Sequence, residues 1–556
     1  MAGLISGAAV QPRATEPAFP VHISVKADQG SGPLEPIWRF FGADEPNYTT
    51  MRDGSRLLGE LGALDRGNVF FRTHNLLNTG DGTPALKWGS TGVYREDDEG
   101  RPVYDWTILD RIFDTCLQRG VRPYVEIGFM PEALSTHPEP YQHSWRPGAR
   151  YDEIYTGWAY PPTDYRKWEE LVRQWAEHAV TRYGEDEVNR WFWEVWNEPN
   201  IPYWQGTQEE FFRLHDHAIR AVRRVLPTAQ VGGPDVAGGP GGRFLEEFLN
   251  HCLHGTNYAT GTIGTPVDFI AFHAKGSPRM EGGHVRMGIA NQLRNINDAF
   301  AVIARFPEFK KTPIVIGESD PEGCAACQGP QLAYRNGTMY SSYTAASFAR
   351  KHALTRRHGV NLIGALTWAF TFDDQPFFAG FRALASNGIG KPVLNVFRMM
   401  SRMKGEQLAV DSDGEVPLDE ILRNGVRGRP DVSALASRDG NRLWVLLWHY
   451  HDDDLPGPAA DITLEISGMS NALEGPMVRQ FRVDGEHGNA YEVWKQMGSP
   501  AVPSLEQYAE LEQAALLAEI PAPEMSELGG GRWSIEMTLP RQGVTLLEIG
   551  RWQAHR

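Results

Sequence analysis

Residues 191–200 have the sequence WFWEVWNEPN, in which an apolar, aromatic run passes directly into polar residues. The run Trp191–Trp196 has the length and composition of a strand that is buried on both faces, as the strands of a parallel sheet are. It predicts that Glu198 stands directly after the carboxyl end of that strand. What flanks the strand along the chain decides the kind of sheet to which it belongs.

Seven further runs of this kind recur along the chain, with helical patterns between them. They cover Ile37–Phe41, Val69–Thr73, Pro123–Phe129, Gln230–Gly233, Phe269–His273, Ile314–Gly317 and Ala365–Phe370. The clearest amphipathic helices are predicted at Asp110–Arg119, Tyr165–Tyr183, Gln208–Val225, Asn291–Arg305 and Met339–Arg357. Eight strand–helix units in succession predict a closed (β/α)8 barrel, also called a TIM barrel, over residues 36–400.

After about residue 400 the pattern changes to alternating strands separated by turn residues. These strands are predicted at Val432–Ser437, Arg442–His449, Asp461–Ile466, Val478–Val483, Trp533–Leu539 and Gly543–Ile549. An accessory antiparallel β-sandwich is therefore expected over residues 401–556, with a helical insert at 504–518. Residues 20–26 alternate in the same way, so the N-terminal segment, residues 1–35, is expected to add a strand to the sandwich.

The composition limits the class of partner. Hydrophobic residues make up 41% of the 556 residues, yet no stretch approaches the roughly 20 apolar residues that span a membrane. A formal net charge of -16 argues against nucleic acid or an anionic membrane as the main partner. The N-terminus lacks the basic start of a signal peptide, so we expect a cytoplasmic location. The sequence leaves the oligomeric state open.

No metal or nucleotide cofactor is predicted. Four cysteines are too few for a disulfide framework. Cys324 and Cys327 form a C-x-x-C pair without the second pair or the histidines that complete a zinc site, so we interpret them as structural or incidental. The sequence also lacks an H-E-x-x-H motif, a P-loop lysine and a convincing dinucleotide-binding glycine motif.

Two glutamates follow predicted strands at the end of the barrel where active sites lie. Glu198 follows the fourth strand and Glu318 the seventh, so both carboxyl groups are expected at the barrel mouth. Such a pair suits glycoside hydrolysis, in which one carboxylic acid protonates the leaving oxygen and an ionised one meets the charge at the anomeric carbon. We expect the aromatic strand to raise the pKa of Glu198 and Arg72 to keep Glu318 ionised.

Other polar and aromatic residues at strand ends have ordinary structural interpretations. A glutamate in such a place is usually a solvated or capping residue, and we interpret Glu126 and Glu322 in that way. His74 and His273 follow or end predicted strands, where a histidine is more often packed or supporting than catalytic. Trp368 is either a packed barrel residue or a surface on which a sugar ring stacks.

The ordered motifs resemble glycoside hydrolase family 39, which holds β-xylosidases and α-L-iduronidases. The stretches that carry the resemblance are His74–Leu77, Gly128–Pro131, Trp196–Asn200, Asp268–His273, Gly317–Ser319, Gly380–Phe381 and Lys391–Pro392. The resemblance implies Glu198 as acid/base and Glu318 as nucleophile of a retaining double displacement. It also places substrate-binding residues around the sugar at the cleavage point, namely His74, Asn197, His273 and Trp368.

One departure from the family pattern affects the choice of substrate. The xylosidases typically have His-x-Tyr at the end of the sixth strand, where this chain has His273-Ala274-Lys275. A lysine there resembles the iduronidases, in which a cation can pair with the substrate carboxylate, and Arg382 is a second candidate cation. Alternatively, Lys275 forms an ion pair with Glu318 or a neighbouring acid.

The preferred function is an exo-acting β-D-xylosidase that releases xylose from the non-reducing ends of short xylo-oligosaccharides. An α-L-iduronidase-like or α-L-arabinosidase activity is the alternative within the same family. A catalytically inactive, sugar-binding barrel is a third hypothesis, which the presence of both glutamates disfavours.

Overall fold

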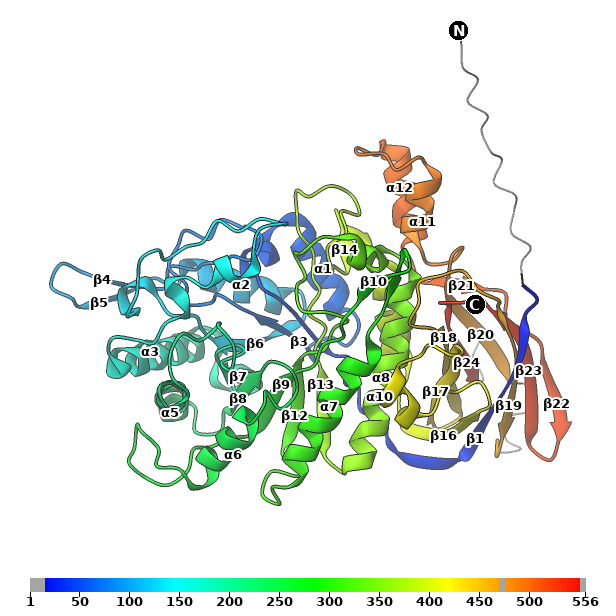
Figure 1. The fold of residues 1–556 in the computed structure, drawn as a ribbon, viewed down its shortest axis with the longest axis horizontal. Helices are drawn as coiled ribbons and strands as arrows, with labels where there is room; N and C mark the ends of the chain where they lie inside the picture. The colour runs from blue at the N-terminus through cyan, green and yellow to red at the C-terminus, as the bar shows by residue number, and fades with distance from the viewer. Residues whose placement is uncertain (1–15, 470–475, 551–556) are drawn as a thin grey trace, which may run out of the picture.

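The computed structural model describes residues 16–469 and 476–550, and it contains the predicted barrel (Figure 1). Its eight parallel strands, in hydrogen-bonded order, are β2 (Phe40–Ala43), β3 (Val69–Thr73), β6 (Val121–Ile127), β7 (Phe192–Val195), β8 (Gln230–Val236), β9 (Phe269–His273), β12 (Pro313–Glu318) and β13 (Asn361–Ala365). A parallel bridge between Phe41 and Thr367 brings the first and last strands together. The barrel fold predicted from the sequence is thus confirmed.

Three strand predictions were displaced along the chain, the third strand by two residues, to Val121–Ile127 from the predicted Pro123–Phe129. The eighth strand ends at Ala365, where the prediction began, and the first strand begins at Phe40 rather than at Ile37. Leu366 and Thr367 still hydrogen-bond to β12 and β2, and the backbone leaves the ladder at Trp368, whose amide donates to Asp320 Oδ1 at 3.0 Å instead of to a neighbouring strand. The second half of the predicted run, residues 368–370, therefore lies at the barrel mouth rather than in the sheet.

Helices cover the outside of the barrel (Figure 1). They are α1 (Arg52–Gly62), α2 (Thr107–Gln118), α3 (Tyr165–Tyr183), α4 (Glu185–Val188), α5 (Gln208–Val225), α6 (Phe244–His254), α7 (Ile289–Ala304), α8 (Thr338–His358) and α9 (Pro392–Arg402). The predicted bounds of α3 and α5 match because caps fix their starts. Asp164 accepts two amides of α3, and Thr207 and Glu210 form a capping box on α5.

An aromatic layer fills the lower part of the barrel. Its rings come from β2, β3, β6, β7 and β9, and the Phe192 ring lies 5.2 Å from Tyr124 and 5.1 Å from Phe269. Side chains alternate along a strand, so the residues two positions further along point inward again, one layer nearer the mouth. Phe70 of β3 packs against the rings of Phe40 and Phe192, so the layer contains Phe40, Phe70, Tyr124, Phe192 and Phe269.

A second, mostly antiparallel sheet lies beside the barrel. In hydrogen-bonded order it contains β21 (Ala518–Ile520), β20 (Met477–Val483), β24 (Val544–Gly550), β18 (Arg442–Tyr450), β17 (Asp431–Asp439), β16 (Glu406–Ser412), β1 (Phe19–Pro33), β19 (Ala460–Ser467), β23 (Arg532–Leu539) and β22 (Met525–Gly529). The N-terminal β1 pairs antiparallel with β16 and parallel with β19, as its blue ribbon among the later strands shows (Figure 1). Distant strands share one apolar core, so this continuous sheet folds over on itself; Val25, Val445, Ile462, Ile535 and Leu547 belong to that core.

A helical insert connects this sheet with the mouth of the barrel. It consists of α11 (Ala490–Gln496) and α12 (Leu505–Ala514), which project from the sheet in Figure 1. Leu511 packs with Phe378 of the loop after β13, and the Tyr508 hydroxyl donates to the carbonyl of Asn387 at 2.9 Å. The insert thereby supports the loop that carries Trp368.

Short elements complete the fold. They are α10 (Leu418–Asn424) and three hairpins: β4 (Tyr94–Glu96) with β5 (Pro102–Tyr104), β10 (Arg279–Glu281) with β11 (His284–Arg286), and β14 (Ala385–Ser386) with β15 (Ile389–Gly390). None of the helices in residues 16–469 and 476–550 is long and apolar enough to span a bilayer.

Candidate active site

A charged layer lies directly above the aromatic one. Arg72 is fully buried at its centre, donating from Nε to Glu194 at 2.6 Å and lying 2.8 Å from Glu126 and 2.5 Å from Asp235 through Nη2. One guanidinium cannot balance three buried carboxylates, so proton uptake relieves the excess charge. Burial raises the pKa of Glu194 to about 8, helped by Asp235, and burial likewise raises the pKa of Glu126 well above its usual range. The interpretation of Glu126 as a solvated or capping residue is wrong, because it is wholly buried.

Glu198 is held by a strained turn after β7. Trp196 and Glu198 have φ angles of 71° and 44°, in the left-handed region that side chains other than glycine rarely adopt. The Glu198 amide donates to the Asp235 carbonyl at 3.0 Å, and the Trp196 indole donates to the Tyr203 carbonyl at 2.9 Å. These bonds hold the turn and present the Glu198 carboxyl group to the barrel mouth.

Glu318 ends β12 among positive charges. Its Oε2 bonds to Lys275 Nζ, and its Oε1 lies 3.8 Å from Arg72 Nη1 and 3.6 Å from His74 Nε2. Burial raises the pKa of this carboxyl group, but the charges of Lys275 and His273 outweigh burial and lower it. Glu318 is therefore ionised, although the nearest cation is Lys275 rather than the predicted Arg72.

His273 connects the two glutamates with the charged layer. Its Nε2 lies 2.6 Å from Asp235 Oδ2, and its Nδ1 lies 2.8 Å from Glu198 Oε1 and 3.8 Å from Glu318 Oε1. Burial alone would lower the pKa of His273, but Asp235, Glu318 and Glu198 together raise it to about 10. The imidazole is therefore protonated and donates from both nitrogens.

The same imidazolium reverses the pKa shift that the sequence predicted for Glu198. Burial does raise the pKa of Glu198, but the charges of His273 and Lys275 outweigh burial and lower it to about 2. The aromatic residues of β7 are packed within and around the barrel, whereas the carboxyl group itself faces cations. In the free protein the proton thus resides on His273, one hydrogen bond away from Glu198.

His74, Asn197 and Trp368 all contact Arg72, and His74 also lies beside Glu318. His74 Nδ1 lies 2.9 Å from Asp44 Oδ1, while burial lowers the pKa of His74, so the neutral ring donates from Nδ1. Its ring centroid is 4.4 Å from that of Trp368. Asn197 Oδ1 accepts from Arg72 at 3.1 Å, and its Nδ2 has no hydrogen-bond partner among the described residues. An amide N–H is thus available there for a hydroxyl group.

Comparison with known proteins now identifies the family. The sequence profile of Glycosyl hydrolases family 39 matches residues 21–526. The chain belongs to glycosyl hydrolase family 39. The "Beta-xylosidase" of Geobacillus stearothermophilus is 28% identical over 504 residues, which cover 87% of this chain and 86% of that protein.

A further relative and a solved structure are also similar to this chain. The "Alpha-L-iduronidase" of Mus musculus is 25% identical over 574 residues, which cover 95% of this chain and 81% of that protein. The crystal structure of the GH39 enzyme from Xanthomonas axonopodis pv. citri shares the fold with a TM-score of 0.72 at 23% identity, covering 98% of this chain and 100% of that one. The family resemblance drawn from the sequence is confirmed, and the protein is a family 39 glycosidase.

Lys275 and Arg382, the two side chains of this family 39 chain that were predicted as possible partners of a substrate carboxylate, differ in their surroundings. Lys275 bonds to Glu318 and also lines a cavity of about 500 Å³ beside Glu198. Arg382 is fully buried behind Trp368, donates to the Trp368 carbonyl at 3.1 Å and pairs with Glu322. It is not among the residues that line the cavity. Glu322, interpreted as solvated or capping, is in fact largely buried and paired with Arg382.

The C-x-x-C pair forms part of the cavity wall in this family 39 structure. Cys324 and Cys327 form a disulfide, and both residues line the cavity. The Arg335 guanidinium donates to the carbonyls of both cysteines at 2.6 Å. The pair is therefore structural, as one of the two sequence interpretations held.

Sequence reasoning missed Asp44 and Asp235, which contact His74 and His273. Asp44 directly follows β2, and Asp235 lies near the end of β8. The predicted first and fifth strands stopped two or three residues too early, at Phe41 and Gly233. Inspecting the residues just beyond those ends would have found both aspartates, because carboxylates at strand ends were the signal for the others.

Proposed function

We propose that the protein is a retaining, exo-acting β-D-xylosidase that releases xylose from the non-reducing ends of short xylo-oligosaccharides. The observation that carries the proposal is the position of both glutamates against one atom, His273 Nδ1, which lies 2.8 Å from Glu198 and 3.8 Å from Glu318. The nearest carboxylate oxygens are thus no further apart than these two distances added together. That limit is compatible with the carboxyl separation of about 5–5.5 Å used for a covalent intermediate, whereas an inverting enzyme keeps its carboxyl groups about 6.5–9.5 Å apart.

Glu318 acts as the nucleophile in this proposal. Lys275 and His273 keep its carboxylate ionised by lowering its pKa. Attack at the anomeric carbon forms a glycosyl ester, which removes the negative charge from Glu318. The oxocarbenium-like charge that develops on the sugar is met by this carboxylate before the bond is complete.

Glu198 acts as acid and then as base. In the productive complex the proton moves from His273 Nδ1 to Glu198 across their 2.8 Å contact, and then to the leaving oxygen. His273 retains its bond to Asp235 during this transfer. In the second step Glu198 takes a proton from the water that attacks the glycosyl ester, and Glu318 leaves as a carboxylate. The proton then returns from Glu198 to His273 Nδ1, which restores the free protein.

The two cations that could bind a substrate carboxylate are already paired with glutamates, which favours a neutral sugar at the cleavage point. The ammonium of Lys275 is bound to Glu318, and the guanidinium of Arg382 is bound to Glu322. A uronide carboxylate would have to compete with these ion pairs. The identity to a protein named "Beta-xylosidase" supports the same choice.

One observation favours an α-L-iduronidase-like activity as the second candidate. Lys275 lines the cavity, so its ammonium can turn from Glu318 to a substrate carboxylate. Initial rates on aryl β-D-xyloside, α-L-arabinopyranoside, α-L-arabinofuranoside, α-L-iduronide and β-D-glucoside separate the possibilities. We expect the xyloside to dominate. A dominant iduronide rate that falls selectively in Lys275→Met would replace the proposal by the second candidate, and no turnover on any substrate would favour an inactive barrel.

A further inference from the structure

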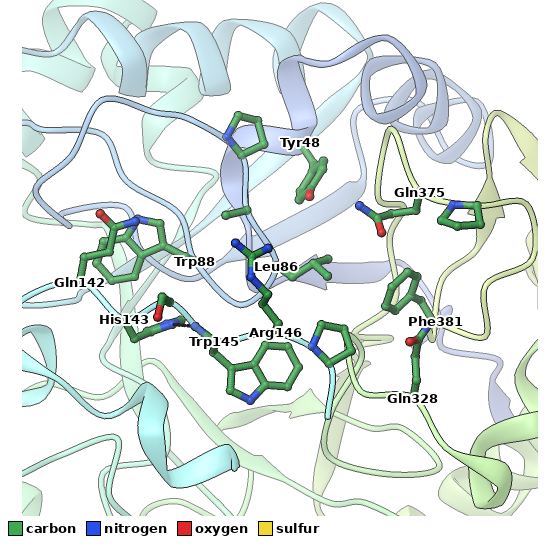
Figure 2. Close-up of a pocket in the computed structure, with 15 residues that line it drawn as sticks. Tyr48, Leu86, Trp88, Gln142, His143, Trp145, Arg146, Gln328, Gln375 and Phe381 are labelled. Carbon is green, nitrogen blue, oxygen red and sulfur yellow. Dashed lines mark hydrogen bonds between the residues drawn. The ribbon is translucent and has the colours of Figure 1, made fainter. Parts of the chain in front are cut away.

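A second hollow lies at the mouth of the barrel, beyond the cavity beside Glu198. It has a volume of about 630 Å³, and its walls come from loops that follow β2, β3, β6, β12 and β13 (Figure 2). All these loops lie at the carboxyl ends of the barrel strands, the end that carries Glu198 and Glu318. The hollow therefore opens on the same face of the barrel as the active site.

The hollow adjoins the active-site cavity at two points. Leu86 and Trp88 line the hollow, while the ammonium of the intervening Lys87 lies 5.3 Å from the ring of Tyr151, which lines the cavity. On the opposite side, Gln328 of the hollow directly follows Cys327 of the cavity. A chain of sugars bound at Glu198 can thus continue into the hollow.

The lining has the chemistry of a sugar site. Tyr48, Trp88 and Trp145 contribute largely buried aromatic rings, and Gln328 and Gln375 contribute amide groups that both donate and accept hydrogen bonds. Aromatic faces pack against the C–H faces of sugar rings, while amides bond to hydroxyl groups. Such a lining suits a polar, uncharged ring better than a lipid or an apolar ligand.

One feature of the lining points to an anion. Figure 2 shows the Arg146 side chain directed into the ring of lining residues. None of those lining residues, all in the described part of the chain, is an aspartate or glutamate. Within residues 16–469 and 476–550, the Arg146 guanidinium has no ion-pair or hydrogen-bond partner. It is a free cation in a protein whose net charge is -16.

Several groups behind the wall are paired or neutral. Asp44 and Lys87 form an ion pair at 2.5 Å, so their charges compensate each other. Burial and the neighbouring Asp44 raise the pKa of Glu45 well above its usual range, which leaves it neutral. Burial lowers the pKa of His143 to about 4, so this lining residue is neutral as well. Asp373 and Asp374 add negative charge near Tyr48, but Asp373 accepts from the amides of Asp53 and Gly54, and neither carboxylate pairs with Arg146 in the described part of the chain. Among the described residues that line the hollow, Arg146 is thus the charged side chain that lacks a partner.

We propose that the hollow binds the leaving-group part of the oligosaccharide and that Arg146 recognises a carboxylate on one of its sugars, namely a uronic acid branch. The inference rests on the proposed function, because it assumes a sugar chain that is cleaved between Glu198 and Glu318. It assigns the acidic group to the leaving side, so the released sugar stays neutral. The substrate class is thus a short β-1,4-linked xylose chain with an unbranched non-reducing end and a uronic acid further along.

The test compares two substrates that differ only in the acidic branch. They are xylotriose and the same trisaccharide with a glucuronic acid on its reducing-end unit. We expect a kcat/KM about fivefold to tenfold higher for the branched substrate, as a hydrogen-bonded charge pair near the surface would give. The preference should shrink when the salt concentration is raised from about 0.05 M to about 0.5 M, because the Debye length then falls from ~14 Å to ~4 Å.

Variants of two neighbouring arginines locate the effect. Arg146→Gln should remove the preference and leave xylotriose hydrolysis within about twofold, since a neutral amide loses only the charged contact. Arg150→Gln is the matched control, because Arg150 lies on the same loop, is exposed, and pairs with Asp152 outside the hollow. Equal rates on both substrates in the unaltered protein, or equal losses on both in Arg146→Gln, would overturn the proposal.

An aryl β-D-xyloside separates this inference from the proposed function. It has no leaving sugar, so Arg146→Gln should hydrolyse it at the unaltered rate. Absence of xyloside hydrolysis in the unaltered protein would refute the proposed function; calorimetric titration with the branched trisaccharide then tests the hollow by itself. Binding that weakens about fivefold or more in Arg146→Gln but not in Arg150→Gln supports the site, and equal binding by all three proteins refutes it.

Discussion

The two inner layers of the barrel differ by only two positions along each strand, yet they are stabilised in opposite ways. The lower layer contains Tyr124 and Phe192, whose rings pack 5.2 Å apart. The upper layer contains Glu126 and Glu194 on the same two strands, arranged around Arg72. Burial itself stabilises the aromatic layer. Burial destabilises the charged layer, which persists only through ion pairs and proton uptake.

The aromatic layer stabilises the fold, whereas the charged layer supports the active site. Aromatic packing tolerates replacement by another apolar side chain of similar size, because the attraction has little directional character. The charged layer has no such tolerance, because each carboxylate depends on the same guanidinium. The charged layer is also linked electrostatically to the active site, since Asp235 contacts both Arg72 and His273.

Arg72→Met tests the charged layer most severely. It leaves three buried carboxylates without their central cation, so we expect the free energy of unfolding to fall by about 3–5 kcal/mol. Activity should fall as well, because Asn197 loses its bond to Arg72. Urea unfolding and initial rates measure both effects. A variant as stable and active as the unaltered protein would show that the layer needs no cation.

Glu198→Ala tests the active site that the charged layer supports. Loss of the acid should lower kcat/KM, which reports the first step, by about 10²–10⁴-fold for substrates with poor leaving groups and far less for activated aryl glycosides, because the latter need little proton donation. The kcat/KM values for xylobiose and for a dinitrophenyl β-xyloside measure the difference. Comparable losses on both substrates would contradict the acid role.

His273→Gln tests the link between the layer and the glutamates through pH. The pKa of His273 is raised to about 10, above the ordinary value near 6.5, so the protonated imidazole stabilises the native state fully below about pH 6.5. That stabilisation should fall as the pH rises from about 6.5 towards 10, and the variant should lack this slope. Urea unfolding at several pH values measures it. Parallel pH profiles for the two proteins would refute the assignment of the proton to His273.

Phe192→Leu should have the smallest effect. Leucine keeps the aromatic layer apolar, so we expect a loss of about 1 kcal/mol in the free energy of unfolding. The pH profile and the rate on an aryl xyloside should remain unchanged, because this residue contacts no ionised group of the active site. A changed pH profile would show that the two layers are not independent.

The same contrast explains what could be predicted from the sequence. The apolar runs predicted the barrel because burial leaves a pattern in the chain, and caps such as Asp164 fixed helix starts. Contacts among buried polar groups leave no such pattern, because they depend on which strands meet across the barrel. Lys275 illustrates this: its residue type and position were noted, but its bond to Glu318 was only one of two alternatives. The pKa of Glu198 was predicted in the wrong direction for the same reason.

The most direct test of the account is to trap the covalent intermediate. In an activated 2-deoxy-2-fluoro-β-D-xyloside, the fluorine slows both steps because it disfavours the positive charge that each step develops. The activated leaving group speeds the first step alone, so the glycosyl ester forms quickly and is released slowly. Peptide mass spectrometry should then find one fluoroxylosyl group, attached to Glu318 and absent from Glu318→Ala. A label on another carboxylate, or turnover without any label, would contradict the proposed double displacement.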